Sequence, residues 1–254
     1  MSTPARSEPI IRRLHDTAGD VGLLREAYGR LYRPQFPDPN ERESLDNILE
    51  SLRAAPEGDD RYSVGVAEAD GGVTGLIISD FLAAPRAGVI EFVVVDPGAR
   101  RCGLGGRLVD WAERQAREHC DAAGLGDLTA MVAELEDPLL VGETGGQDPV
   151  ARAAWWARRG FQALDFPYVQ PSLSPAQRPV RHLLLMARTG CADLRESVPP
   201  DWVASLVTAY ARFAMRRDEP ERDPSVAEML AWLGRQRDVG WTALEPYLGR
   251  SQNA

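Results

Sequence analysis

Apolar residues along the chain follow two different periods, and the alternation of these periods predicts an α/β fold. Spacings of three and four residues predict helices, whereas alternation of apolar and polar residues predicts strands. The predicted helices cover residues 17–31, 40–52, 103–124 and 150–159. The predicted strands cover residues 9–14, 61–68, 73–81, 89–95, 127–134, 161–169 and 180–188. Ile10 and Ile11 are expected to form the buried part of the first strand.

Glycine and proline mark where several of these elements end. Asp70-Gly71-Gly72 predicts a hairpin turn, and the three prolines within residues 34–39 predict the end of the first helix. Residues 137–149 place glycines and prolines among acidic side chains, which predicts a surface loop. A loop of this length is either functional or a neutral insertion.

After Thr189 only helical spacing remains, with one apolar stripe over residues 202–213 and another over residues 226–233. We therefore divide the chain into a disordered tail at residues 1–8, an α/β domain at residues 9–189 and a helical C-terminal extension at residues 190–254. Three roles are open to the extension: packing on the domain, covering its functional site, or forming the contact of a homodimer.

Composition narrows the class of partner. The 254 residues carry a net charge of −9, which argues against nucleic acid and anionic membranes as partners. Three cysteines, an odd number at irregular spacings, favour reduced thiols and a cytoplasmic location, and no metal-binding pattern accompanies the three histidines. All 29 basic residues are Arg, which indicates a bacterium with a GC-rich genome.

The chain has a marked glycine-rich turn between the strand at residues 89–95 and the helix that follows it. The turn contains Arg100-x-x-Gly103-x-Gly105-Gly106. Glycine permits positive φ and a close approach of backbone to a ligand, and the N-terminus of a helix attracts anions. The spacing matches neither a dinucleotide-binding GxGxxG loop nor a P-loop with its Lys. We therefore expect a phosphate-binding turn of another type.

This turn resembles the pyrophosphate loop of the GCN5-related N-acetyltransferases, the GNAT superfamily. Residues 151–161 resemble the family's second signature, an aromatic pair (Trp155 and Trp156) on a short helix that is closed by Gly160-Phe161. The resemblance covers residues 9–188. It implies a mixed, mostly antiparallel central sheet flanked by helices, and acetyl-CoA as cosubstrate.

The resemblance also implies which residues bind acetyl-CoA. The backbone of Val93, Val94 and Val95 would pair with the pantetheine arm, and amides of residues 101–106 would hold the pyrophosphate. This assigns cofactor binding to Arg100, Arg101, Cys102, Gly103, Leu104, Gly105, Gly106 and Trp156. Members of the family that use a general acid usually have Tyr where Trp156 stands, and an indole N–H cannot protonate a thiolate.

Acyl transfer to an amine needs a proton acceptor, a donor to the oxyanion and a proton for the leaving thiolate. Glu134 resembles the Glu that serves as base in some members, and Glu91 shares strand parity with Val95; each is otherwise a carboxylate at the rim. Tyr168 is a candidate general acid or a core tyrosine, and water is the alternative acid. A backbone N–H near Val95 would bind the oxyanion.

The acceptor is expected to contact the first helices and the late strands. Tyr32, Arg33 and Phe36 are the candidate acceptor-binding residues, with Tyr168, Gln170 and Arg181 as further ones. The favoured hypothesis is an N-acetyltransferase of specialised metabolism that acts on an amine or hydrazine-type nitrogen of a small molecule. The alternatives are a protein N-terminal or lysine acetyltransferase and a non-catalytic acyl-CoA-binding module.

Overall fold

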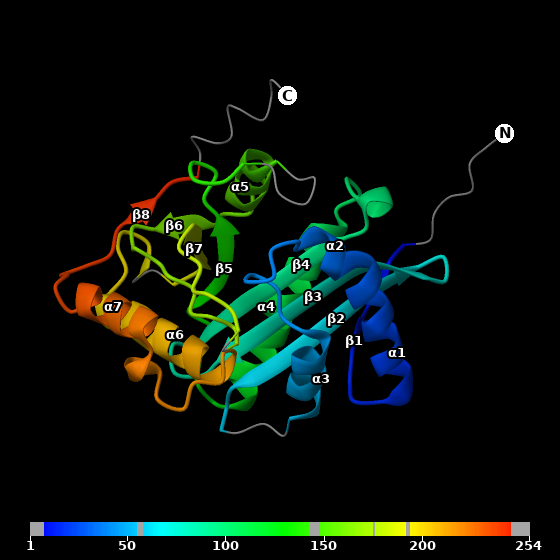
Figure 1. Ribbon diagram of the computed structural model, residues 1–254, viewed down its shortest axis with the longest axis horizontal. Coiled ribbons are helices and arrows are strands. Elements are labelled where there is room, and N and C mark those ends of the chain that lie inside the picture. Colours follow the sequence, from blue (N-terminus) through cyan, green and yellow to red (C-terminus); the bar gives the residue numbers. More distant parts are fainter. Residues whose placement is uncertain (1–7, 55–57, 143–147, 175, 192–193, 245–254) are drawn as a thin grey trace.

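A computed structural model describes residues 8–54, 58–142, 148–174, 176–191 and 194–244. The expected disorder of residues 1–8 falls almost wholly outside this part of the chain, as does the centre of the 137–149 loop. The described residues form an eight-stranded sheet in the order β1-β2-β3-β4-β5-β7-β6-β8 (Figure 1). The strands are β1 (Ile10–Arg13), β2 (Arg61–Ala69), β3 (Gly72–Leu82), β4 (Ala87–Val95), β5 (Ala130–Glu136), β6 (Gln162–Leu164), β7 (Leu183–Thr189) and β8 (Trp241–Thr242).

Pairing within this sheet is antiparallel except between β4 and β5, so the predicted mixed, mostly antiparallel sheet is confirmed. The hairpin between β2 and β3 turns at Asp70 and Gly71, which both have positive φ. A helix is needed to join β4 to its parallel neighbour, and α4 (Leu104–Ala122) makes that connection.

Two layers of helices cover the sheet (Figure 1). On one face α4 and α5 (Pro149–Ala157) share an apolar core that includes Leu108, Met131 and Trp156. On the other face α1 (Ala18–Ala27) and α3 (Leu45–Arg53) pack over β2, β3 and β4. The same face continues with α6 (Pro200–Phe213) and α7 (Pro224–Leu233), whose side chains pack on β4, β5 and β7.

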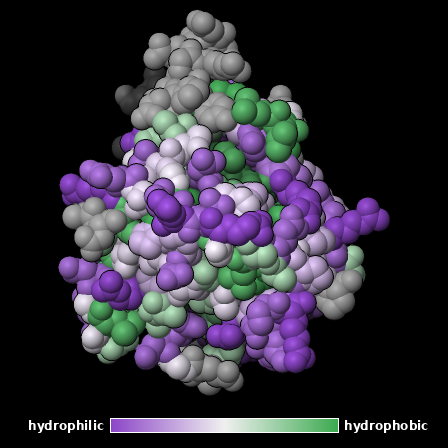
Figure 2. All heavy atoms as spheres, turned by 90° about the vertical axis from the view of Figure 1, so that its left-hand side faces the viewer, coloured by the Kyte–Doolittle hydropathy of each residue, from purple (hydrophilic) through white to green (hydrophobic). Residues whose placement is uncertain are grey.

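The C-terminal extension is therefore built into the sheet. Val203, Leu206 and Val207 of α6 are buried with Val89 and Val132, and β8 pairs with β6. The face that carries these C-terminal elements shows hydrophilic and hydrophobic residues intermixed (Figure 2). Among the three roles open to the extension, these contacts support packing on the α/β domain.

Several predicted boundaries were wrong. Ile10 is 73% exposed, because β1 is an edge strand and only the partly buried Ile11 turns toward the core of α4. The first helix continues past residue 31, because a π-helical turn (Tyr28–Tyr32) and α2 (Arg33–Gln35), with Pro34 in its first turn, carry it to Gln35. It still ends within the proline-containing residues 34–39, as predicted. The second helix begins at Leu45, where Ser44 accepts a hydrogen bond from the Asn47 N–H.

The late strands also differ from the prediction. The strand predicted over residues 161–169 is reduced to the three residues of β6, since Phe166 and Tyr168 instead pack against the C-terminal helices. No helix in the described part of the chain has the length and apolar character needed to cross a membrane.

Candidate active site

The candidate site lies where β4 and β5 separate. The two strands pair in parallel only from Ala87 to Ile90 on β4, opposite residues 130–133 of β5. Glu91 then forms a bulge, because Ile78 of β3 pairs with Phe92 while the adjacent Ser79 pairs with Ile90. Beyond the bulge β4 stays paired with β3 and β5 stays paired with β7, so that each strand turns an open edge toward the other.

Two hollows meet at this opening. An outer cleft of about 130 Å³ extends along Val93 and Val94 to Trp156 on α5, and an inner pocket of about 30 Å³ extends beneath α6. Glu91, Phe92, Glu134 and Gln170 line both of them. A wider hollow of about 540 Å³ lies at the β1 edge of the sheet, among residues such as Arg107 and Arg114, away from this opening.

The glycine-rich turn lies at the end of β4 and has the form expected of an anion-binding turn. Its backbone reaches positive φ at Arg101 (65°) and at Gly103 (81°), and Gly103 is the N-cap of α4. No side chain caps the amides of this first turn. Amides left free at a helix N-terminus bind phosphate readily, so this turn fits the pyrophosphate group of acetyl-CoA.

Gly105 and Gly106 have a different role from Gly103, since neither adopts positive φ. A Cβ on Gly105 would lie 3.0 Å from the Trp155 ring, and a Cβ on Gly106 would lie 2.6 Å from a guanidinium nitrogen of Arg159. These two glycines therefore make room for α5 and the residues after it. The Arg159 guanidinium, which stacks on the Trp155 ring at 3.6 Å, is thereby held against the positive end of α4.

The arginines of the turn are arranged in different ways. Arg100 donates hydrogen bonds from Nε to the Val95 carbonyl oxygen (3.3 Å) and from Nη2 to Gln35 Oε1 (3.0 Å). Its side chain therefore joins the turn to the last residue of α2, and Arg101 is exposed. The exposed Cys102 thiol donates to the Ala99 carbonyl oxygen (2.8 Å), so it lies in the turn as a local contact.

Glu134 and Tyr168, both candidates from the sequence, come together in the site. The buried Tyr168 hydroxyl donates a short hydrogen bond to Glu134 Oε1. Burial raises the pKa of Glu134 to about 7, and the hydrogen bond from Tyr168 opposes that shift. Burial and the adjacent Glu134 raise the pKa of Tyr168 well above its usual value, so its hydroxyl stays protonated at neutral pH.

Glu91 also reaches this place, although strand alternation from Val95 puts it on the opposite face of the sheet. The bulge reverses its direction, and Glu91 points with Glu134 toward the α6 face, while Val93 and Val95 pack against α4. Burial and the neighbouring Asp80 raise the pKa of Glu91 well above its usual range. Regular alternation alone cannot predict this orientation.

Two further acidic residues of the site were missed in the sequence. Asp80 on β3 is 2% exposed and lies beside Glu91, and Glu43 precedes α3 and lines the inner pocket. Burial raises the pKa of Glu43 to about 8. The signal for Asp80 was present in the sequence, because a carboxylate that interrupts an otherwise apolar strand is rarely buried without a function or a partner.

Only some of the residues that were expected to bind the acceptor line the two hollows. Phe36 and Gln170 line the outer cleft. Tyr32 is fully buried, and its hydroxyl accepts a hydrogen bond from the Glu43 N–H at 2.9 Å, so it supports the loop that carries Glu43. Arg33 is exposed and is not among the residues that line the two hollows, and Arg181 pairs with Glu228 on the surface.

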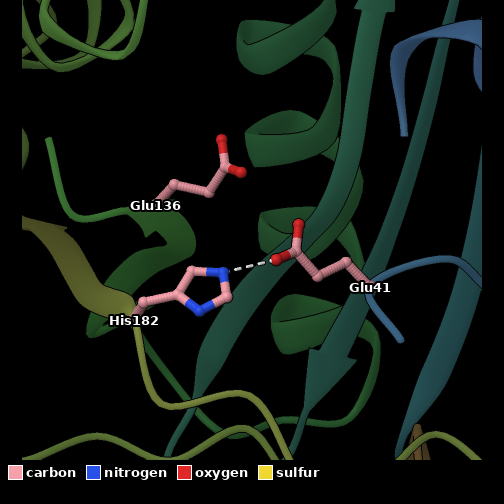
Figure 3. Close-up of side chains that lie close together, drawn as sticks. All are labelled: Glu41, Glu136 and His182. Carbon is pink, nitrogen blue, oxygen red and sulfur yellow. Dashed lines mark hydrogen bonds and ion pairs between the residues drawn. The ribbon is translucent and has the colours of Figure 1, made fainter. Parts of the chain in front are cut away.

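Glu41, Glu136 and His182 form a second cluster at the rim of the outer cleft (Figure 3). Their ligand-type atoms all lie within 4.8 Å of one another. His182 Nε2 lies 2.6 Å from Glu41 Oε1, and Arg152 forms a short ion pair with Glu136. Each carboxylate thus already has a basic partner, which makes the cluster an ion-pair network that joins the 36–44 loop to β5, α5 and the start of β7.

Comparison with known proteins agrees with this geometry. Residues 25–133 match the model of the acetyltransferase (GNAT) family. A GNAT-family protein from Bacteroides thetaiotaomicron superposes with a TM-score of 0.55 at 18% identity, covering 80% of this chain and 98% of its own. The matched residues make up less than half of the chain, and they support the resemblance to the GNAT family that the glycine-rich turn predicted.

Two other solved structures are similar at a lower level. A tandem GNAT protein from the clavulanic acid biosynthesis pathway is 23% identical with a TM-score of 0.48, and the match covers 63% of this chain but only 46% of that protein. The ribosomal-protein-S18-alanine N-acetyltransferase from Escherichia coli is 14% identical with a TM-score of 0.44, over 71% of this chain and 94% of its own. No functionally curated protein matches the sequence.

Proposed function

We propose that this chain transfers an acetyl group from acetyl-CoA to the nitrogen of a small amine or hydrazine, by direct attack in a ternary complex, in the cytoplasm of a bacterium. The observation that carries the proposal is the meeting of Glu134, Tyr168 and Glu91 at the point where β4 and β5 separate. The match to the GNAT family model supports the donor, and the free amides after Gly103 fit its pyrophosphate.

When bound, acetyl-CoA supplies the thioester carbon that the acceptor nitrogen attacks. The turn from Arg101 to Gly106 holds the pyrophosphate, and the open edge of residues 93–95 is available to the pantetheine amides. The N–H of a residue near Val95 stabilises the oxyanion that forms on the carbonyl oxygen. Trp156, 7% exposed in the outer cleft, forms an apolar wall there.

Glu134 accepts the proton that the acceptor nitrogen loses as the new N–C bond forms. Its raised pKa suits this role, because a base that titrates near neutral pH is ionised and still takes a proton readily. Tyr168 orients Glu134 through their hydrogen bond. The sulfur that leaves when the C–S bond breaks takes its proton from Tyr168 or from water.

Two alternatives make different predictions. A protein acetyltransferase needs room for a peptide, whereas the inner pocket is small and is covered by α6. A non-catalytic acyl-CoA-binding module has no need of a buried carboxylate hydrogen-bonded to a tyrosine. Both observations favour the small-molecule enzyme. Trp156 stands where a Tyr would be the general acid, so in this enzyme Tyr168 or water would protonate the thiolate instead.

The test is thiol release from acetyl-CoA with a panel of amines, hydrazines, amino acids and peptides. We expect release with one class of small acceptor and loss of release in Glu134→Gln. The matched control is Glu228→Gln, which removes an exposed carboxylate outside both hollows and should leave the rate unchanged. Acetylation of peptides alone would replace the proposal with the protein acetyltransferase, and tight binding of acetyl-CoA without any transfer would replace it with the binding module.

A further inference from the structure

The inner pocket is lined by several acidic side chains. Glu43, Glu91 and Glu134 line it from three different parts of the chain: the segment before α3, the bulge of β4 and the end of β5. Asp80 lies behind Glu91 on β3. On the opposite wall the pocket is lined by Tyr210 of α6 and by Arg216, which follows α6.

The polar atoms of this pocket are incompletely satisfied. Glu91 Oε2 and both carboxylate oxygens of Asp80 are buried, and apart from a proton that these two neighbouring carboxyl groups can share they have no hydrogen-bond partner among the described residues. A buried acceptor without a donor is costly, so such groups usually have a ligand or a catalytic role. Glu91 lines both hollows, so its side chain lies beside the path that a ligand joining them would take.

Arg216 is the nearby cation, and its donors are already used. Its guanidinium forms a short ion pair with Glu50 and donates to the Asn47 carbonyl oxygen (3.2 Å) and to Ser51 Oγ (2.9 Å), all on α3. It thereby joins the end of α6 to α3 beside the pocket. Its charge favours the ionised forms of Glu43 and Glu91, but its hydrogen bonds go elsewhere.

The size of the pocket limits what can enter it. About 30 Å³ is close to the volume that one water molecule occupies in the liquid, and an ammonium group is of similar size. A ring or a peptide side chain would not fit there in full. A small cation with several N–H donors would supply the missing hydrogen bonds and the missing positive charge together.

We propose that the acceptor is a dibasic amine, whose second, cationic nitrogen binds in the inner pocket between Glu43 and Glu91 while its nucleophilic nitrogen lies beside Glu134. This inference rests on the proposed function and names its substrate class. Glu134 lines both hollows and Glu43 lines only the inner one, so the two nitrogens are separated along the line from the outer cleft to the inner pocket. The net charge of −9 further favours a cationic acceptor.

The groups around the pocket imply that proton release accompanies binding. Burial raises the pKa of Glu43 and of Glu91, and Asp80 and Glu134 adjoin them with raised pKa values of their own. Tyr210 and Tyr168, whose pKa values are also raised, stay neutral. A cation entering the pocket favours the ionised carboxylates, which lose protons as it binds.

The experiment compares matched pairs of acceptors in the full-length enzyme: propylamine with 1,3-diaminopropane, and butylamine with 1,4-diaminobutane. We expect kcat/KM to be about tenfold or more higher for the diamine of each pair. In Glu43→Gln this ratio should fall toward one. Asp46→Asn, which neutralises an exposed carboxylate on α3, is the control and should keep the wild-type ratio.

A second readout separates this role of Glu43 from a purely structural one. Calorimetric binding of 1,3-diaminopropane in two buffers of different ionisation enthalpy should show proton release, and Glu43→Gln should release fewer protons. Equal kcat/KM for both members of each pair, or a diamine preference that persists in Glu43→Gln, would overturn the inference and leave the acetyltransferase standing. Thiol release with no amine of either kind would remove the proposed function and the inference with it.

Discussion

At the scale of single residues, the protonation state of Glu134 determines when the proposed enzyme works. Burial raises its pKa to about 7, and a base must be ionised to accept a proton. With a weakly basic acceptor such as an aromatic amine, which is already unprotonated at neutral pH, we therefore expect kcat/KM to rise with pH through about 7 and then to level off. Glu134→Gln should lower kcat by about 10²- to 10⁴-fold and remove this inflection.

The control for this prediction is Tyr168→Phe, which keeps the carboxylate and removes only the hydrogen bond to it. Because that bond favours the ionised form, its loss should move the inflection to higher pH without abolishing it. Steady-state rates between pH 6 and pH 9 measure both effects. An inflection near pH 7 that survives in Glu134→Gln would show that another group is the base.

Arg159 lies within the second motif but received no role from the sequence, and its position gives a second prediction. Its guanidinium lies over Gly106 in the first turn of α4, where a cation is unfavourable unless an anion is also bound. Arg159→Ala should raise the KM for acetyl-CoA roughly tenfold, the effect of losing one charge-assisted hydrogen bond. It should change kcat little, and Arg159→Lys should restore part of the affinity.

The control is Arg181→Ala, which removes an exposed arginine that pairs with Glu228. Initial rates at varied acetyl-CoA and saturating acceptor distinguish the two variants. If Arg159→Ala bound acetyl-CoA as tightly as the wild type, Arg159 would be a structural partner of Trp155 and no part of the phosphate site.

Single residues also show which parts of the candidate site could be predicted from the sequence alone. Glu134 could be singled out because it lies near the end of a recognisable strand pattern, and Tyr168 because it follows the Gly160-Phe161 motif, although the strand predicted around it does not form. The structure brings the two side chains together, and their roles stay predictions. Glu43 could not be predicted as a site residue, because it lies in an irregular segment. The path of that segment depends on two hydrogen bonds of the Glu43 backbone: its carbonyl oxygen accepts one from the Tyr28 hydroxyl, and its N–H donates one to the Tyr32 hydroxyl. In the sequence, Tyr210 is recognisable only as part of an apolar helical stripe. Its position beside the inner pocket depends on how α6 packs on the sheet.

At the scale of elements, periodicity predicted the regular helices and strands, and it failed where local geometry changes. The alternation of apolar and polar residues in the sequence does not reveal the bulge at Glu91, yet the bulge places the Glu91 side chain on the other face of the sheet. The β6 region reads as a long strand, but competing contacts of Phe166 and Tyr168 with the C-terminal helices shorten it. Tertiary packing decided both cases.

Helix α6 gives a prediction at this scale, because its buried face belongs to the core of the eight-stranded sheet. Leu206 is 1% exposed beside residues of β4 and β5. Leu206→Ala should lower the free energy of unfolding by about 2–5 kcal/mol, the usual cost of such a cavity. Urea unfolding followed by fluorescence should still show one transition for the whole chain.

Arg212→Ala, on the exposed side of the same helix, is the matched control and should change the free energy of unfolding by less than about 0.5 kcal/mol. Two transitions, of which only the less stable one responds to Leu206→Ala, would show that residues 190–254 fold as a unit of their own. A single shifted transition would show that the extension is a layer of the domain.

At the scale of the whole molecule, the acidic side chains in and behind the inner pocket make the stability of the fold depend on pH. Glu43, Asp80, Glu91 and Glu134 all have pKa values raised by burial in the folded protein. A carboxyl group of this kind stabilises the fold fully below its unfolded pKa, near 4.5, and this contribution is lost as pH rises through the folded pKa. The window set by Glu134 and Glu43 extends to about pH 8.

We therefore expect Tm to fall as pH rises from about 5.5 to 8.5, at roughly 2–4 °C for each kcal/mol lost in a chain of this size. Glu43→Gln should make the fall smaller, because one of the titrating groups is gone. Glu228→Gln removes the same charge from an exposed site, so it reports the general effect of net charge. If both variants changed the slope equally, overall charge repulsion and not the pocket would cause it. Adding 1,3-diaminopropane should raise Tm more at pH 8 than at pH 6, since the cation binds the ionised carboxylates, and scanning calorimetry at both pH values measures the difference.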